Sequence, residues 1–284
     1  MSEQQTSRRE LPPSFFYFSA LTPGDRRLWF EQVLIDNKAY FRSRDQLNDP
    51  TELRPAVVFE GTDKQKRAFV KRLMRAHSPR ELPPAKRLVE ESRLIRELSN
   101  APQVFEREFH RILDRVGIFC LSEIATSSPF WAYYADGHKG ACVEFDRDLG
   151  FFVMAQPIVY TDEPRVINRL VDSHEELFNK SMCFKGTAWS HEHEWRVIAR
   201  FEDVERATRY KEQHSVALTA QTFMGDQHGP GYYSFPSQAI RSVILGQKAS
   251  VETESWLREV VERAPSHISI KRASVSNSGV VTVS

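Results

Sequence analysis

Apolar and polar positions along this chain follow two different periods. Runs in which apolar residues fall on every second position, or dominate a short segment, predict β-strands; they cover 14–21, 38–43, 116–123, 140–146, 151–162, 192–201, 239–246 and 267–275. Runs in which apolar residues recur every three or four positions predict helices; they cover 24–37, 62–77, 84–100, 102–116, 127–137, 163–184 and 250–264. Because strands and helices alternate irregularly, the pattern predicts an α+β fold.

Three of the predicted helices follow one another without an intervening strand. They predict a helical insertion at 62–116 within a single α+β domain that spans residues 1–284. Between Asp63 and Arg115 there are 14 Lys and Arg residues against 8 Asp and Glu residues, an excess of six positive charges. The whole chain carries a net charge of only +1, so the insertion is basic and the remainder is slightly acidic.

Composition limits the classes of protein that fit this sequence. No run of 18 apolar residues is present, so we expect no membrane-spanning helix and no membrane partner. The first residues, MSEQQTSRRELPP, lack the apolar core of a secretory signal. The three cysteines show no CxxC spacing, which is typical of free thiols in a reducing compartment. These features together favour a cytoplasmic location.

The strand at 192–201 carries an unusual pair of acidic residues at its start. Its alternation, extended backwards, puts Glu192, Glu194 and Arg196 on one face. Residues two apart on a strand lie roughly 6.5–7 Å apart, so both carboxylates are within reach of one small ligand. Such a pair suits a reaction that builds positive charge on a sugar carbon, because one carboxylate stabilises that charge and the other accepts a proton. The structural alternative is a solvated strand end with a local ion pair.

Two histidines are interleaved with these glutamates. His191 and His193 form an HxH pair, which binds transition metals in some proteins. No HExxH sequence or further closely spaced His or Cys residue completes a metal site. We therefore assign no metal, and the histidines are expected to be solvated or packed.

The segment 120–140 places a hydroxyl, aromatic rings and a cation close together in sequence. Ser122 ends a predicted strand, Trp131 and Tyr134 lie on a short predicted helix, and His138 and Lys139 precede a glycine turn. Such groups suit the binding of an aromatic ring and of phosphates. The alternative is that the two aromatic residues pack in the core.

A turn-prone segment follows the second predicted strand. Asn48, Asp49 and Pro50 form an Asx-type turn by composition. Arg44 lies just before this turn and Glu52 just after it. A surface turn is the ordinary explanation of this sequence.

Taken in order, these segments resemble the bacterial domain-of-unknown-function 2971 family over roughly residues 14–275. The matching positions are Asn48, Asp49, Pro50 and Glu52; Cys120 and Ser122; Trp131, Tyr134, His138, Lys139 and Gly140; Lys185, Trp189, Glu192, Glu194, Trp195 and Arg196; and Gly246. That family often has an aromatic-basic-aromatic first strand, where this chain has Phe16-Tyr17-Phe18.

The same residues are similar in outline to the ADP-ribosyltransferase superfamily. Enzymes of this kind have a polar residue on the first strand, a serine on a middle strand and a Glu-x-Glu at the start of a later strand. The resemblance implies a split mixed or antiparallel sheet, with the counterparts of these groups at Tyr17, Ser122, Glu192 and Glu194.

The resemblance also implies roles for individual residues. Glu194 is the catalytic carboxylate that holds the nicotinamide ribose, Glu192 assists the acceptor, and Ser122 supports them. Tyr134 or Trp131 stacks on nicotinamide. The remaining nucleotide-binding residues are expected to be the polar groups nearby, with Lys139 or Arg44 at the pyrophosphate: Tyr17, Arg44, Asn48, His138, Lys139 and Arg196.

The sequence thus favours an enzyme that consumes NAD as its substrate, as an ADP-ribosyltransferase or a glycohydrolase, and that acts as a bacterial toxin or a phage-defence effector. The acceptor is expected to be a nucleic acid or a protein. One alternative is a nucleic-acid-binding protein or nuclease that uses the basic helices, with Phe69, Phe105 and Phe109 as stacking groups. Another is a nucleotide sensor without catalytic activity.

Overall fold

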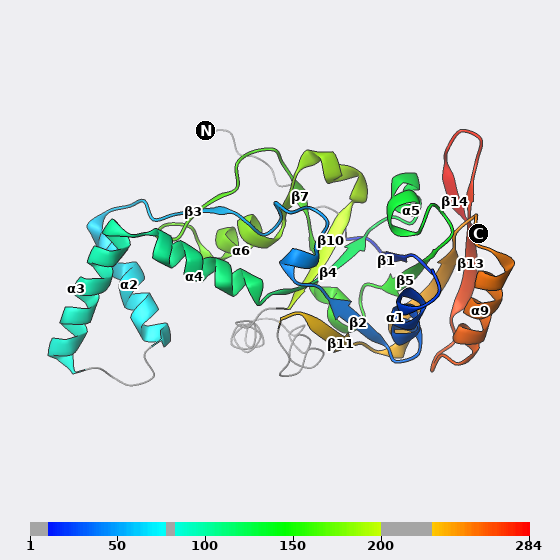
Figure 1. Ribbon diagram of the computed structural model, residues 1–284, viewed down its shortest axis with the longest axis horizontal. Helices are drawn as coiled ribbons and strands as arrows, with labels where there is room; N and C mark the ends of the chain where they lie inside the picture. Colours follow the sequence, from blue (N-terminus) through cyan, green and yellow to red (C-terminus); the bar gives the residue numbers. More distant parts are fainter. Residues whose placement is uncertain (1–10, 78–82, 200–228) are drawn as a thin grey trace. The chain divides into compact units, whose positions relative to one another are not determined.

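The computed structural model describes residues 11–77, 83–199 and 229–284 (Figure 1). The chain divides into two compact units. The first consists of Met1–Phe41, Gly117–Pro157 and Ser190–Ser284, and the second of Arg42–Val116 and Ile158–Trp189. The helical insertion predicted at 62–116 is therefore one part of the larger second unit.

An eight-stranded sheet forms the centre of the first unit. The strand order is β14-β13-β12-β5-β1-β4-β10-β6. The strands are β1 (Ser14–Ser19), β4 (Gly117–Ser122), β5 (Ala141–Asp146), β6 (Gln156–Pro157), β10 (Glu194–Ala199), β12 (Ile240–Leu245), β13 (Ser269–Val275) and β14 (Val281–Val283). Strands β12 and β13 pair in parallel and the other neighbours pair antiparallel, so the sheet is mixed. The α+β class predicted from the sequence is confirmed.

The two faces of this sheet are covered by different elements. On one face, the main core packs helices α1 (Asp25–Leu34) and α9 (Val251–Glu262) against strand residues such as Phe119, Val143 and Phe145. A short antiparallel pair, β2 (Lys38–Phe41) with β11 (Gly231–Ser234), joins this layer. On the other face, helix α5 (Ser128–Tyr134) buries Trp131 against Phe18. Because successive strand residues alternate between faces, parity decides which layer each side chain joins.

Glu144 links neighbouring strands of the sheet. Glu144 on β5 accepts hydrogen bonds from Ser14 Oγ at 2.9 Å and Ser242 Oγ at 2.5 Å, and Lys271 Nζ lies 2.8 Å away. Partial burial acts to raise the pKa of Glu144, but the hydrogen bonds from Lys271, Ser242 and Ser14 outweigh it and hold the pKa below the usual 4.5. The charged carboxylate therefore ties β5 to three other strands, β1, β12 and β13.

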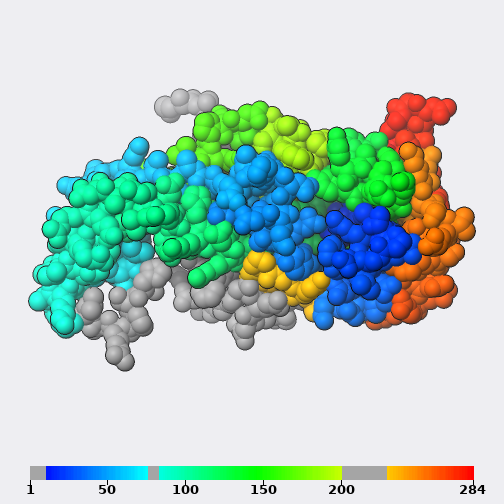
Figure 2. Space-filling view, viewed as in Figure 1, coloured from blue at the N-terminus to red at the C-terminus, as the bar shows by residue number. Residues whose placement is uncertain are grey.

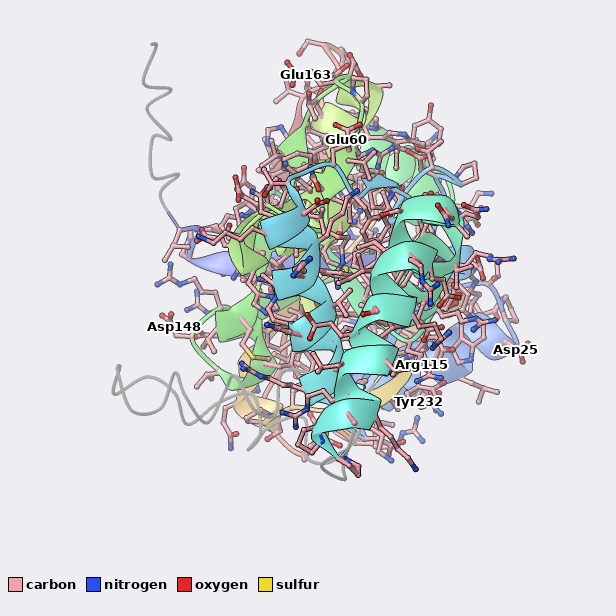
Figure 3. All side chains as sticks on the ribbon, turned by 90° about the vertical axis from the view of Figure 1, so that its left-hand side faces the viewer. Asp25, Glu60, Arg115, Asp148, Glu163 and Tyr232 are labelled. Carbon is pink, nitrogen blue, oxygen red and sulfur yellow. The ribbon has the colours of Figure 1, made fainter. Side chains whose placement is uncertain are left out.

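Helices dominate the second unit. They are α2 (Asp63–His77), α3 (Pro84–Asn100), α4 (Gln103–Asp114) and α6 (His174–Met182), with 3-10 turns η1 (Arg44–Gln46) and the start of η3 (Thr187–Glu192). Two parallel strand pairs accompany them: β3 (Ala56–Val58) with β8 (Val166–Asn168), and β7 (Val159–Tyr160) with β9 (Phe184–Lys185). Helices α2 and α3 lie side by side, as Figures 1 and 3 show.

A small apolar cluster holds these helices together. Phe69 and Val70 of α2 pack with Leu98 of α3 and with Leu170, and Phe105 of α4 packs against them. Phe69 and Phe105 lie ring to ring at 6.3 Å. The apolar spacing of the helices is thus used for packing, which is the ordinary role of an amphipathic helix.

Two predicted elements are wrong. The strand expected at 151–162 is instead a 3-10 turn, η2 (Gly150–Met154), followed by the two-residue strands β6 and β7. The helix expected at 163–184 is only α6, which begins after Ser173 because that side chain and Glu176 form a capping box. Strand β10 is described as far as Ala199, and the predicted positions Arg200 and Phe201 lie outside the described residues. Among the described residues, no helix is long and apolar enough to cross a membrane.

Candidate functional site

The ends of β4 and β10 bring the predicted catalytic residues together. The two strands pair antiparallel, and Glu194 lies directly opposite Ser122. Both side chains are buried, on the sheet face opposite the main core. Because the pairing runs from Glu194–Ser122 to Ala199–Gly117 without a bulge, the register that joins the two residues is fixed over six residue pairs.

Arg196 holds Glu194 in place. The two residues are two positions apart on β10 and therefore share a face, as the sequence predicted. Arg196 Nε lies 2.7 Å from Glu194 Oε1, and Arg196 Nη2 lies 3.1 Å from Oε2. The guanidinium is fully buried and the carboxylate is 2% exposed. A bidentate pair of this kind fixes both the charge and the orientation of the carboxylate.

Glu192 reaches the same place by a different route. It lies in η3, and His193 with φ of +46° separates it from β10, so the predicted extension of the strand back to Glu192 is wrong. The left-handed residue turns the chain at this point. Glu192 is nevertheless 2% exposed, and its Oε1 accepts a hydrogen bond from the Tyr134 hydroxyl of α5.

The Ser122 hydroxyl acts on the backbone. Ser122 Oγ donates to the Glu192 carbonyl oxygen at 2.9 Å and accepts from Ile124 N at 3.3 Å. It thereby fastens η3 to the end of β4. Ser127 does the same for the neighbouring residue, because its Oγ donates to the His191 carbonyl oxygen at 3.4 Å while it caps α5. We call Ser122, Tyr134, Glu192, Glu194 and Arg196 the carboxylate cluster.

A third glutamate beside the cluster was not predicted from the sequence. Glu123 Oε2 accepts a hydrogen bond from Trp195 Nε1 at 2.8 Å, and its Oε1 lies 3.2 Å from His193 Nδ1. These contacts give His193 an acidic neighbour at the strand end. Within the described residues, no three His, Cys, Asp or Glu side chains converge as the ligands of a metal ion do.

Two aromatic residues proposed for the nucleotide lie elsewhere. Trp131 is fully buried, donates from Nε1 to the Ala125 carbonyl oxygen at 2.8 Å and meets Phe18 edge to face at 5.1 Å. It is a core residue, so of the two residues expected to stack on nicotinamide, Tyr134 or Trp131, the assignment to Trp131 is wrong. Tyr17 stacks on Phe119 at 5.1 Å on the main-core face of the sheet, opposite the carboxylate cluster. The register sets Phe16 opposite Ser122, which turns Tyr17 away.

His138 and Lys139 belong to a turn that docks onto the sheet. His138 has φ of +72°, and its carbonyl oxygen accepts from Lys248 N at 2.9 Å. A Cβ on Gly246 would lie 2.2 Å from that carbonyl oxygen, so only glycine fits there. Burial and the charge of Lys248 lower the pKa of His138. Lys139 is 63% exposed and its ion-pair partner is Asp136, so neither residue joins the carboxylate cluster.

The second unit has a buried charged group of its own. Lys185 Nζ lies 3.1 Å from Glu52 Oε1, and both side chains are at most 5% exposed. The same ammonium lies 4.7 Å from the centre of the Trp189 ring. Burying the charged Lys185 and Glu52 side chains costs desolvation free energy, which the ion pair and the cation–π contact offset. The sequence resemblance included these three residues but did not assign them to the site.

The turn after η1 is the Asx turn that its composition predicted. Asp49 Oδ1 accepts from Thr51 N at 2.8 Å and from Thr51 Oγ1 at 2.7 Å, which is an Asx turn. Partial burial acts to raise the pKa of Asp49, but the Thr51 hydrogen bonds and the charges of Arg165 and Lys185 outweigh it and lower the pKa. Asn48 precedes this turn and is exposed.

Arg44 is committed to contacts inside the second unit. Its Nη2 lies 2.6 Å from Asp114 Oδ1, and its Nη1 donates to the Leu53 carbonyl oxygen at 3.2 Å. Nη1 also lies 3.2 Å from His110 Nδ1, and burial followed by the charge of Arg44 lowers the pKa of that histidine. The predicted role of Arg44 at a pyrophosphate is therefore wrong, because its guanidinium is buried and bound to α4.

Comparisons with protein-family models, curated proteins and solved structures found no match. The chemistry of the carboxylate cluster therefore rests on its own geometry. Two buried carboxylates, one fixed by a guanidinium and one bound to a phenol, form a preorganised anionic centre suited to stabilising positive charge.

Proposed function

We propose that this protein is an NAD-consuming enzyme of the ADP-ribosyltransferase type, a transferase or a glycohydrolase, with its reaction centre at the carboxylate cluster. The observation that carries the proposal is the meeting of Ser122, Tyr134, Glu192 and Glu194 at one strand end. Ser122 and Tyr134 come from β4 and α5, and Glu192 and Glu194 come from the adjoining η3 and β10, so the cluster joins two segments that are far apart in sequence.

Glu194 suits the part of the reaction that develops positive charge. When the bond between ribose C1′ and the nicotinamide nitrogen breaks, the bonding electron pair leaves with nicotinamide and the ribose carbon becomes cationic. A carboxylate held ionised by Arg196 stabilises that charge without having to reorient. In this proposal the two guanidinium contacts, one on each carboxylate oxygen, orient Glu194 toward the ribose.

Glu192 suits the acceptor side. Water or an acceptor hydroxyl forms the new bond to C1′, and its proton passes to a general base. Glu192 accepts a hydrogen bond from the Tyr134 hydroxyl on Oε1, which orients the carboxylate, and in this proposal Glu192 is the proton acceptor. Ser122 acts on this centre through the backbone of Glu192 and is a positioning residue.

Burial sets a condition on this mechanism. Both carboxylates are 2% exposed, so NAD reaches them only after the residues that cover them move. Excluding water in the closed state strengthens the interaction of Glu194 with a cationic ribose.

The test follows nicotinamide release from NAD by the purified full chain, alone and with protein and nucleic-acid acceptors. We expect Glu194→Gln to lower the rate by about 100-fold or more, as removal of one preorganised electrostatic group does in other enzymes. Glu60→Gln is the matched control, because Glu60 is exposed (Figure 3) and the change in charge is the same. Circular dichroism of each variant separates lost chemistry from lost folding.

The products identify the reaction class. Free ADP-ribose indicates a glycohydrolase, whereas ADP-ribose bound to an acceptor indicates a transferase. No nicotinamide release by the wild-type protein under any of these conditions contradicts the proposal, as does a loss of less than tenfold in a folded Glu194→Gln variant. Binding of NAD by calorimetry without turnover would indicate a sensor.

A further inference from the structure

The exposed side of helix α2 carries only cations and one alanine between its first and last turns. Lys64, Arg67, Lys71, Arg72 and Arg75 are all exposed, and at 100° per residue they fall within an arc of about 140°. We call these five residues the basic face. Phe69 and Val70, on the opposite side of the helix, are buried in the apolar cluster of the second unit. Packing thus fixes which side of α2 is turned outward.

The cations of the basic face are mostly without acidic partners. Of the five, only Lys71 has an acidic group within 4 Å among the described residues, Glu91 at 3.9 Å. On neighbouring α3, Arg93 alone is paired among the described cations, and it lies between two glutamates at 2.7 Å and 3.0 Å. Four of the five cations of the basic face are therefore uncompensated within the described residues, as are the exposed Lys86, Arg87 and Arg96 of α3.

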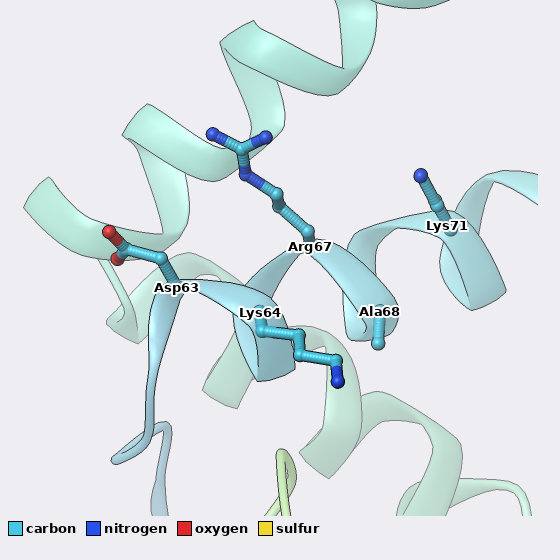
Figure 4. A pocket seen from close by; sticks show the side chains of 5 residues that line it. All are labelled: Asp63, Lys64, Arg67, Ala68 and Lys71. Atoms are coloured by element: carbon cyan, nitrogen blue, oxygen red, sulfur yellow. The ribbon is translucent and has the colours of Figure 1, made fainter.

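The shape of this surface fits an extended anion. Asp63, Lys64, Arg67, Ala68 and Lys71 line a shallow open depression on α2 (Figure 4). The small side chain of Ala68 is one of those that line it. From Lys64 to Arg75 the basic face extends about 16 Å, at 1.5 Å per residue. A single small anion uses only part of this length.

We infer that the basic face of α2 binds the phosphate backbone of duplex DNA without sequence specificity. Phosphates along one strand of the duplex are spaced about 3.4 Å per residue of helix axis, so the basic face spans several of them. The major groove of B-form DNA, about 12 Å wide, admits an α-helix, whereas the major groove of A-form RNA is too narrow for side chains.

The aromatic residues of these helices favour a duplex over a single strand. Binding of single strands relies on aromatic side chains on which bases stack. Phe69 and Phe109 are buried and Phe105 packs in the apolar cluster, so the stacking roles considered for them from sequence are wrong. Helix α3, whose surface is visible in Figure 2, exposes the large apolar residues Leu88 and Val89. Both are aliphatic, so they offer no aromatic ring on which a base could stack. This inference does not rest on NAD chemistry, because it involves none of the carboxylate cluster.

The test is fluorescence anisotropy of a 30-base-pair DNA of arbitrary sequence with the full-length protein at 50 and 200 mM salt. With three to four phosphates contacted, the affinity is expected to fall about 40- to 150-fold between these concentrations. The triple variant Lys64→Gln/Arg67→Gln/Arg72→Gln should weaken binding at least tenfold at 50 mM salt and flatten the salt dependence by about two to three units of slope.

The control changes the net charge equally at another surface. Arg26→Gln/Arg258→Gln/Arg263→Gln also removes three exposed cations and takes the net charge from +1 to −2. It should retain the wild-type affinity within twofold. Equal weakening by both triple variants, absence of binding by the wild type at 50 mM salt, or tighter binding of single-stranded DNA or duplex RNA each overturns the inference.

Discussion

The ion pair between Arg196 and Glu194 predicts a large and specific loss of stability on Arg196→Met. At 2.7 Å and an effective dielectric constant of about 20, the Coulomb attraction between the two charges is roughly 6 kcal/mol. Part of this is offset in the native protein by the cost of burying both charges. Methionine removes the cation but leaves the carboxylate buried, which in comparable buried pairs costs about 3–5 kcal/mol.

A surface pair of the same length provides the comparison. Arg258 Nη2 lies 2.7 Å from Glu254 Oε1 on α9, but the Arg258 side chain is 60% exposed. Arg258→Met is therefore expected to cost less than about 1 kcal/mol, because water screens the pair. Because the two ion pairs have the same N···O distance, the difference between the two losses of stability reports the effect of burial.

The assay is urea unfolding followed by tryptophan fluorescence and by circular dichroism. Because the chain has two compact units, the free energies are compared only where the two probes give coincident transitions. Adding Glu194→Gln to Arg196→Met should recover about 1–3 kcal/mol, since the double variant no longer buries a carboxylate that has lost its guanidinium. A loss under about 1 kcal/mol for Arg196→Met, or no recovery in the double variant, refutes the reasoning.

Three further predictions concern single contacts. Ser122→Ala removes the bond to the Glu192 carbonyl oxygen and should lower the free energy of unfolding by about 1–3 kcal/mol in urea titrations. Gly246→Ala puts a Cβ 2.2 Å from the His138 carbonyl oxygen and should lower the melting temperature sharply or prevent folding, as scanning calorimetry would detect. Glu144 has a depressed pKa in the folded state, so its contribution to stability is present above the unfolded pKa near 4.5 and is lost as pH falls through the folded value. Glu144→Gln should therefore make the unfolding free energy less dependent on pH below about 4.5.

Each of these has a clear opposing outcome. Gly186→Ala is the control for Gly246→Ala, because the nearest atom to its added Cβ lies 3.8 Å away. Equal melting temperatures for the two alanine variants contradict the argument from close approach. Wild-type stability in Ser122→Ala shows that the hydroxyl is dispensable. If the unfolding free energies of the wild type and Glu144→Gln depend on pH in the same way below 4.5, Glu144 does not contribute to the loss of stability in acid.

The sequence determined the elements whose causes are local. Helices α2, α3, α4 and α9 lie within two residues of their predicted bounds, because apolar spacing and nearby prolines specify them without reference to the rest of the chain. Ser127 caps α5 through a contact that is also local, since a cap bonds only to the first turn. The pairing of Glu194 with Arg196 likewise follows from the two-residue period of a strand.

Tertiary structure decided the features that depend on register and on partners distant in sequence. The meeting of Ser122 with Glu194, the hydrogen bond from Tyr134 to Glu192 and the turning away of Tyr17 all depend on which strand pairs with which, and in what register. A strand's own alternation defines two faces but does not say which one meets a partner. The burial of Trp131 is decided in the same way, because the seven-residue helix α5 buries this side chain only when it packs on the sheet.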